Sequence, residues 1–151
     1  VGGARMKLLL QRVREASVTV AGTEVGRIGQ GLLVFVGVER EDSAELAARL
    51  TERLLNYRMF ADAEGKTNLS VRDIAGGVLL VSQFTLAADT RRGLRPGFSL
   101  AATPALAESL YRNMLEQLRN EPHVQVASGI FAADMQVSLI NDGPVTFLLE
   151  G

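Results

Sequence analysis

The chain has 151 residues, a formal net charge of −1 and a hydrophobic fraction of 47%. This length suits one domain, and the balanced charge excludes the strong positive field typical of proteins that bind long nucleic acids. The chain has no cysteine and one histidine, His123, which excludes disulfides, thiolate metal sites and a histidine-rich metal centre within one chain. No apolar run approaches the ~20 residues of a membrane span, and we expect no membrane partner, no metal and no cofactor.

The first residues carry no pattern of an export signal. Three leucines follow Met6 and Lys7, but polar residues come directly after them, so the apolar stretch is too short. Residues 1–5 precede a candidate initiator, Met6, and we interpret them as an expression remnant. Residues 6–151 then form a single domain. Together with the missing cysteines, these observations favour an intracellular, cytoplasmic protein.

The first half of the chain begins with strand patterns and then changes to a helical period. Four segments have the apolar patterns of strands: residues 6–13, 16–20, 25–28 and 32–36. The last is apolar on both faces, so we expect it in the centre of the sheet. Leucines then recur every four residues after a capping-box spacing at Asp42 and Glu45, which predicts a helix over about residues 43–56. A short strand is predicted over residues 57–60.

The second half contains one more helix and further strands. Thr103 and Pro104 have the residue types of a helix start, and Pro122 ends the periodic segment. Four more segments are predicted as strands: residues 77–81, 124–126, 135–140 and 145–149. The tight links between strands require antiparallel pairs. We therefore predict an α+β fold, a mostly antiparallel, barrel-like sheet with two main helices packed against it.

Polar side chains interrupt the buried strand at its carboxyl end, in Ser82, Gln83, Phe84 and Thr85. A buried hydroxyl or amide costs ~1–3 kcal/mol unless it is hydrogen-bonded, so these groups are either well paired or face a pocket. If the strand continued, Gln83 and Thr85 would lie on one face, and Ser82 and Phe84 on the other.

Three further features have both a structural and a chemical interpretation. Gly143-Pro144 is either a hairpin turn between two strands or a rigid backbone wedge that faces a ligand. Ser82 or Thr85 could act as a nucleophile only with an adjacent base, and His123 follows a helix-ending proline, which disfavours a Ser-His-Asp triad. Asp89, Asp134 and Asp142 lack the spacing of metal ligands.

One basic cluster, Arg91, Arg92 and Arg95, lies in a loop with glycine and proline. Arginines in such a loop either grip phosphate or are simply solvated, and the sequence does not favour one over the other. No aromatic residue alternates with these arginines, so we expect no base-stacking platform there.

Taken together, Ser82-Gln83-Phe84-Thr85 and Asn141-Asp142-Gly143-Pro144-Val145-Thr146 resemble the two signature motifs of D-aminoacyl-tRNA deacylases. The resemblance runs from Met6 to the C-terminus. It includes Gln11-Arg12-Val13, Arg95-Pro96 and the segment from Gly129 to Met135. Leu86-Ala87-Ala88-Asp89 lacks a tyrosine that the family pattern would have, and Ala132 stands where glycine is common.

The resemblance implies an enzyme that hydrolyses the ester between a D-amino acid and tRNA, and glycyl-tRNA as a further substrate. It implies a homodimer in which a cis Gly143-Pro144 pair enters the partner's pocket and excludes L-amino acids. Arg12 would fix that motif, and the region of Phe131 and Met135 would receive the terminal adenosine. The expected partners are the tRNA acceptor end and a second copy of the chain, and no DNA.

Two mechanisms follow from the resemblance. In one, Thr85 attacks the ester. In the other, which we favour because no base lies near Thr85 in the sequence, the terminal 2′-hydroxyl of the tRNA assists attack by water. Backbone N–H groups near Phe84 and Thr85 would then stabilise the oxyanion. A different class of function, a non-catalytic RNA-binding or editing-accessory module of the same fold, is the alternative.

Overall fold

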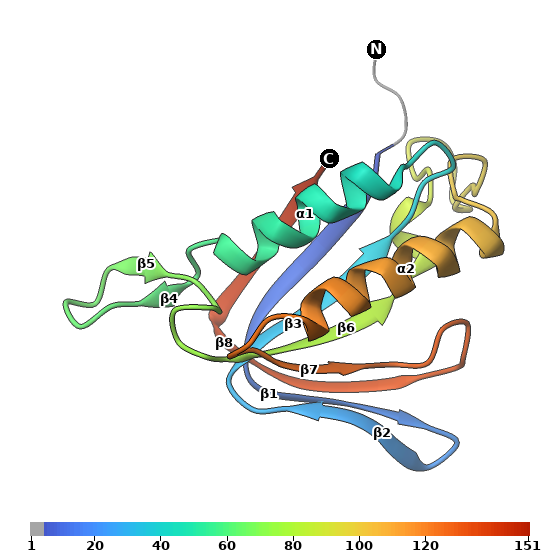
Figure 1. Ribbon diagram of the computed structural model, residues 1–151. Helices are drawn as coiled ribbons and strands as arrows, with labels where there is room; N and C mark the ends of the chain where they lie inside the picture. Colours follow the sequence, from blue (N-terminus) through green and yellow to red (C-terminus); the bar gives the residue numbers. More distant parts are fainter. Residues whose placement is uncertain (1–4) are drawn as a thin grey trace.

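The computed structural model describes residues 5–151, so most of the segment interpreted as an expression remnant lies outside the described residues. Six strands form one sheet (Figure 1): β1 (Lys7–Val20), β2 (Thr23–Ile28), β3 (Gly31–Gly37), β6 (Gly77–Ser82), β7 (Gln125–Ser128) and β8 (Gln136–Glu150). The strand order is β2-β1-β3-β6-β7, and β8 pairs with β1. The pairs of β1 are antiparallel, whereas β3–β6 and β6–β7 are parallel. The predicted α+β class is confirmed.

Strand β1 is continuous where two strands were predicted. Its first half pairs with β3, its second half pairs with β2, and β8 runs along almost its whole length on the other edge. The polar pair Arg14 and Glu15 is exposed and coincides with a register shift against β8, not with a chain break. The prediction of separate strands over 6–13 and 16–20 was therefore wrong, because neighbours on both edges hold the polar residues in the ladder.

Strand β8 is also continuous, which overturns the prediction of two strands joined by a turn. Both halves of β8 pair with the same strand, so they are collinear and cannot form a hairpin. Gln11 pairs with Thr146 and Val13 pairs with Asn141. Residues 142–145 therefore form a bulge in β8 opposite the single residue Arg12.

Two helices cover one face of the sheet (Figure 1), α1 (Ala44–Asn56) and α2 (Pro104–Arg119). Thr103 caps α2 as predicted, and its hydroxyl accepts a bond from the N–H of Leu106 at 3.3 Å. The cap of α1 is Ser43, not Asp42. The Asp42 carboxylate instead accepts bonds from the N–H groups of Met6 (2.9 Å) and Glu39 (2.7 Å), so it ties the entry of β1 to the segment before the helix.

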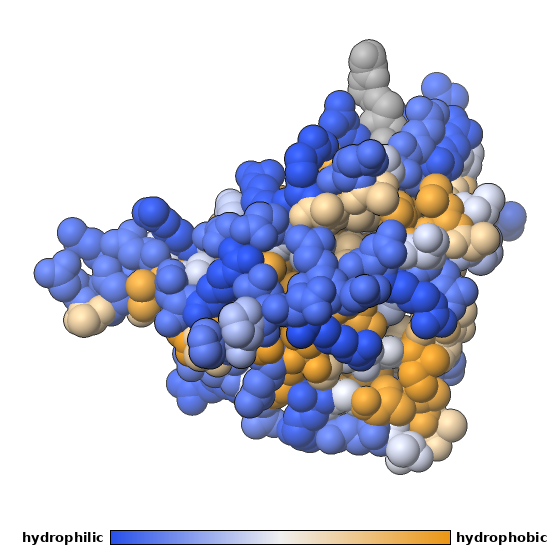
Figure 2. Space-filling view, in the orientation of Figure 1, coloured by the Kyte–Doolittle hydropathy of each residue, from blue (hydrophilic) through white to orange (hydrophobic). Residues whose placement is uncertain are grey.

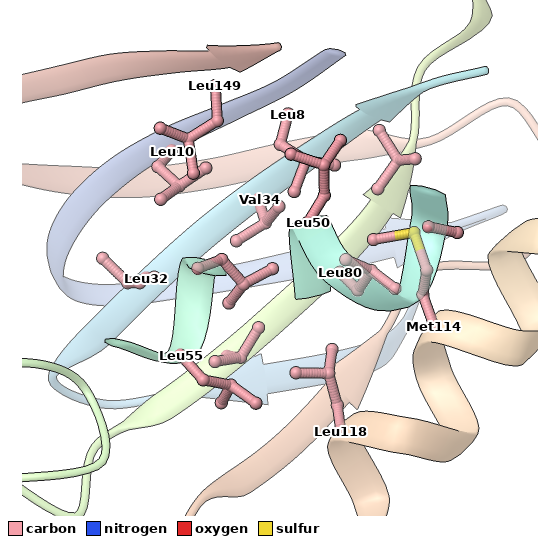
Figure 3. Packing of buried hydrophobic residues seen from close by; sticks show 14 of the residues in the cluster. Leu8, Leu10, Leu32, Val34, Leu50, Leu55, Leu80, Met114, Leu118 and Leu149 are labelled. Atoms are coloured by element: carbon pink, nitrogen blue, oxygen red, sulfur yellow. The ribbon is translucent and has the colours of Figure 1, made fainter. Parts of the chain in front are cut away.

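The main core lies between the helices and the sheet, as Figure 3 shows. Leu50 and Leu55 of α1 and Met114 and Leu118 of α2 point toward the strands. They meet fully buried strand residues: Leu8, Leu10, Leu32, Val34 and Leu80. Burying each such leucine contributes about 1.5–3 kcal/mol, so this layer fixes the sheet on which the site is built.

A small two-stranded ribbon completes the domain. The short strands β4 (Phe60–Ala61) and β5 (Thr67–Leu69) form an antiparallel pair, and the strand predicted over 57–60 begins later than expected. Within residues 5–151 no helix is both long and apolar enough to cross a membrane.

Arg72 links the ends of the two helices. Its guanidinium donates to Glu52 of α1 at 2.8 Å and to both carboxylate oxygens of Glu121, beyond α2, at 2.6 and 2.8 Å. These bonds lower the pKa of both carboxyl groups. The stabilisation is therefore present above the ordinary carboxyl pKa and is lost as the pH falls through the lowered values.

We predict that Arg72→Met lowers the free energy of unfolding by about 1 kcal/mol at pH 7, since Glu52 is half exposed and contributes little. Urea unfolding at pH 7 and at pH 3 measures the loss, which should be smaller at pH 3. Arg112→Met, which breaks the exposed pair with Glu108, is the matched control and should cost less. A loss of equal size at both pH values would contradict the link between the lowered carboxyl pKa values and stability.

Candidate functional site

A cavity of about 390 Å³ lies where β6 ends, against the start of α2 and the connection between β7 and β8. Three groups of residues line it: Val36, Val38, Val81, Ser82, Gln83 and Phe84 from the sheet and its end; Ala101, Ala102, Pro104 and Ala107 around the start of α2; and Phe131, Ala132, Ala133, Met135 and Val137. Figure 2 shows apolar side chains at the surface along this edge of the molecule. The walls are mostly apolar, and polar groups enter only at the end of β6.

The polar strand end does not continue as a strand. The N–H of Gln83 donates to Val36 O at 2.8 Å, and residues Phe84–Ala87 then turn into a 3₁₀ helix, η1. The alternation expected for Ser82 to Thr85 is therefore wrong. Ser82 and Gln83 line the cavity, whereas Thr85 lies beside it, exposed, with its hydroxyl bonded to the Gln83 amide.

The start of η1 leaves backbone donors free. Within residues 5–151, neither the N–H of Phe84 nor that of Thr85 has a hydrogen-bond acceptor. The first N–H groups of any helix lack partners in the helix itself. Because Phe84 lines the cavity, these donors lie close to its polar end and are available to an oxygen atom of a ligand.

Phe131 and Met135, four residues apart in the sequence, lie in the wall of this same cavity. The Phe131 ring packs against Tyr111 of α2 with ring centroids 6.0 Å apart. Gly129 makes room for Met135, because a Cβ atom at that position would lie 2.5 Å from the methionine sulfur. Both side chains are therefore held in place by neighbours outside the cavity.

Tyr111 of α2 supports the site from behind, a role that the sequence did not predict. It is 3% exposed, and its hydroxyl donates to Leu80 O, two residues before Ser82, at 2.7 Å. Burial raises the pKa of Tyr111 to about 12. A tyrosine in a buried helix stripe needs a partner for its hydroxyl, and that requirement was the available signal in the sequence.

The Gly143-Pro144 pair forms the crest of the β8 bulge, exposed to solvent, with a cis peptide bond. The Arg12 guanidinium donates to Asp142 O at 2.8 Å and to Met59 O at 2.7 Å. The Asn141 amide closes the bulge by accepting from the N–H of Val145 at 2.7 Å. Gly143 has φ of 146°, and a Cβ there would lie 2.6 Å from a methyl group of Val145, so only glycine fits.

The two groups of site residues lie apart within one chain. Arg12, Gly143 and Pro144 do not line the cavity. Arg12 pairs with Leu32 on β3, whereas the cavity residue Ser82 pairs with Val36, four residues further along that strand. This places the bulge roughly 13 Å away along the strands and three strands across the sheet from Ser82.

Strand β8 carries exposed apolar side chains before and after the bulge. Leu139, Ile140, Phe147 and Leu148 are 37%, 51%, 41% and 48% exposed. A row of large apolar residues on one strand is typical of an interface with another chain.

His123 lies far from the polar strand end, so no triad forms with Ser82. It is exposed and precedes β7, and Gln125 of β7 pairs with Gly77 at the opposite end of β6. Five residues of strand, roughly 16 Å, separate Gly77 from Ser82. Within one chain, a Ser-His-Asp triad built on Ser82 and His123 is therefore excluded. In the described part of the chain, no three acidic or histidine side chains come together as a metal site would require.

The arginine loop lies next to the cavity. Backbone bonds of 2.7 and 2.9 Å join Asp89 and Gly97 at its base. Arg91 pairs with Asp89 at 2.9 Å and holds the pKa of that carboxyl group far below its usual range. Phe98 packs against Phe84 with centroids 5.3 Å apart. No aromatic residue alternates with the arginines in the sequence, but folding places Phe84 against Phe98 of the same loop.

The comparisons with known proteins agree over almost the whole chain. The family model described as D-Tyr-tRNA(Tyr) deacylase matches residues 9–150. A protein of Pseudomonas putida (strain GB-1) named D-aminoacyl-tRNA deacylase is 63% identical over 145 residues, which cover 96% of this chain and 99% of that one. A protein of Azotobacter vinelandii with the same name is 62% identical over the same shares.

Two solved structures share the fold. One, titled "c-Myc DNA Unwinding Element Binding Protein", has a TM-score of 0.89 at 41% identity and covers 96% of this chain and 98% of its own. The other is titled "Structural Analysis of a probable eukaryotic D-amino acid tRNA deacylase". It has a TM-score of 0.84 at 16% identity, covers 97% and 99% of the two chains, and shows the fold alone.

We predict that Tyr111→Phe lowers the free energy of unfolding by about 1–3 kcal/mol at pH 8, since Leu80 O loses its partner in a buried place. The raised pKa adds a pH dependence. The contribution of Tyr111 is complete below pH 10, the ordinary tyrosine pKa, and is lost as the pH rises through about 12. The unfolding free energy of the native chain should thus fall more steeply between pH 10 and 12 than that of Tyr111→Phe. Parallel curves would contradict this.

Proposed function

Since the chain belongs to the D-Tyr-tRNA(Tyr) deacylase family, we propose that it hydrolyses the ester bond between a D-amino acid and the 3′ end of tRNA. The products are the free D-amino acid and tRNA. The observation that carries the proposal is the cavity at the end of β6, which is lined by Ser82, Gln83 and Phe84 and has free backbone donors beside it. The role is a cytoplasmic quality-control step of translation.

The cavity suits the terminal nucleoside and its ester. Its size lies within the range of small-molecule sites, and its walls are apolar with few polar groups. Phe131 and Met135 offer an aromatic ring and a polarisable thioether to the adenine base. Ser82 and Gln83 lie at the polar end, where the ester would be placed.

The reaction proceeds without a side-chain base. A water oxygen bonds to the ester carbonyl carbon, the bond to the 3′-oxygen breaks, and the 3′-oxygen takes up the proton that the water gives up. The terminal 2′-hydroxyl of the tRNA assists the attack, and the N–H groups of Phe84 and Thr85 stabilise the oxyanion. Two observations support this: the only histidine is remote, and the Thr85 hydroxyl is engaged with the Gln83 amide. The alternative, a Thr85 nucleophile, lacks a base within reach.

Selection against L-amino acids comes from Gly143-Pro144 of a second copy of the chain. The pair is exposed, is held by Arg12 and Asn141, and lies away from the cavity of its own chain. The apolar row on β8 beside it would be covered in a homodimer. A backbone wedge that excludes one stereoisomer does not exclude glycine, so glycyl-tRNA is a further substrate.

Binding without catalysis is the competing function, as an RNA-binding or editing-accessory module of the same fold. One structural relative carries a DNA-binding title. DNA as a partner of this chain is not proposed, because a net charge of −1 provides little attraction for a long duplex.

We predict the outcome of deacylation assays on the native chain and on Thr85→Ala. D-Tyr-tRNA should be hydrolysed and L-Tyr-tRNA spared, and Thr85→Ala should keep activity within about tenfold of the native chain, because the attacking oxygen comes from water. A D-Tyr-tRNA with a 2′-deoxy terminal adenosine should not react. Single-turnover deacylation followed by acid gel measures all three.

His123→Ala is the matched control and should leave the rate unchanged. An inactive Thr85→Ala protein that still folds and binds tRNA would overturn the water mechanism. If the native protein hydrolyses neither D-Tyr-tRNA nor L-Tyr-tRNA, the result would favour the non-catalytic RNA-binding function.

We predict that each active site combines the cavity of one chain with the Gly143-Pro144 pair of the other. Gly143→Ala distorts the wedge, and Ala107→Phe fills the cavity, so each homodimer should lose activity on the order of 100-fold. A mixed dimer of one Gly143→Ala chain and one Ala107→Phe chain can be purified through two different tags. If the pair enters the partner's cavity, one site of this dimer contains both substitutions and the other contains neither. Its activity should recover to about half of the native value. A mixed dimer as inactive as the two homodimers would show that the motif acts within its own chain.

A further inference from the structure

The loop between η1 and α2 presents an exposed surface beside the cavity. Residues 90–99 are all exposed, and the backbone bonds between Asp89 and Gly97 hold the base of the loop closed. The loop meets the cavity at two places: Ala101 and Ala102 line it directly, and Phe98 packs on Phe84, which also lines it. A ligand that is bound in the cavity and extends out of it on this side therefore contacts the loop.

Two of the three arginines in the loop form no salt bridge, although the charge of Arg92 helps Arg91 to lower the pKa of Asp89. Arg91 is occupied by Asp89, whereas Arg92 and Arg95 have no carboxylate within 4.0 Å among the described residues. Positive charges without partners in a chain of net charge −1 favour an anionic ligand at this place. The guanidinium fork matches the geometry of phosphate oxygens.

The same surface offers an aromatic face. Phe84 is 62% exposed and Phe98 is 42% exposed, and their rings are tilted by 45°. An exposed ring next to unpaired cations is the combination that binds single-stranded nucleic acid, in which bases stack on rings and phosphates meet arginine. Neither feature is required for the packing of the core.

We infer that this loop holds the single-stranded 3′ end of the tRNA just before the terminal adenosine. Arg92 and Arg95 contact its phosphates, and Phe98 stacks on one of its bases. The inference rests on the proposed function and extends it, because it assigns a second binding surface outside the cavity. Recognition by the loop is independent of the amino acid and adds affinity for tRNA as such.

The test compares two substrates. D-Tyr-tRNA carries the 3′ strand, whereas the D-tyrosyl ester of adenosine lacks phosphates and fits the cavity alone. For Arg92→Ala/Arg95→Ala we expect kcat/KM on D-Tyr-tRNA to fall on the order of tenfold. Hydrolysis of the adenosine ester should stay unchanged. The slope of log kcat/KM against log salt should become shallower by about 1.4, at ~0.7 for each lost contact with a single strand.

Arg119→Ala is the control for the loss of a positive charge elsewhere on the surface. Arg119 is an exposed arginine in the last turn of α2, roughly 22 Å along the helix from Pro104 at the cavity. If it lowers kcat/KM on D-Tyr-tRNA as much as the double variant does, the effect is one of net charge and the inference fails. An equal loss on both substrates would also overturn it, since the loop would then act on the cavity. A native protein that hydrolyses neither substrate contradicts the proposed function instead.

A second pair of variants tests the proposed stacking of a base on Phe98. Phe98→Tyr keeps an aromatic face and should retain activity on D-Tyr-tRNA, whereas Phe98→Leu should lose it on the order of tenfold with the adenosine ester unaffected. Equal activity of the two variants on D-Tyr-tRNA would remove Phe98 from the proposed surface.

Discussion

The hydrogen bonds between β1 and its neighbours determine where every part of the site lies. β1 pairs with β3 on one edge and with β8 on the other over the same residues, so the cavity and the β8 bulge are positioned by one strand. Arg12 lies opposite the bulge and uses its guanidinium to hold Asp142 O and Met59 O. Without these bonds, a bulge of four residues opposite one would have no defined path, and the Gly143-Pro144 crest would not be rigid.

The cavity is formed in a different way, by the end of a buried strand and not by an insertion. β6 is parallel to both of its neighbours, and its carboxyl end meets the start of α2. The change to η1 leaves backbone N–H groups free beside an apolar wall, where a hydrogen bond to a developing charge is stronger than in water. Tyr111 stabilises this end by its bond to Leu80 O.

Much of the fold was predictable, because it follows from local patterns. The central β3 and the capped helix α2 come from apolar periodicity and helix-start residues. The continuity of β1 and β8 was not predictable, since it depends on pairing between segments about 130 residues apart. In the site, the two motifs were recognised, and the resemblance drew attention to the region of Phe131 and Met135, which line the cavity. Tyr111 and the Phe84–Phe98 pair were missed, because only tertiary packing gives them their partners.

The bulge in β8 has a consequence for assembly. β8 pairs with β1 on one side only, so within residues 5–151 its other side is an open sheet edge with apolar side chains nearby. Such an edge invites the addition of further strands and, eventually, fibres. Pro144 lacks an N–H group and the bulge interrupts the ladder, so a foreign strand cannot pair along the full length. The motif proposed to select the substrate thereby also protects the protein against open-ended aggregation.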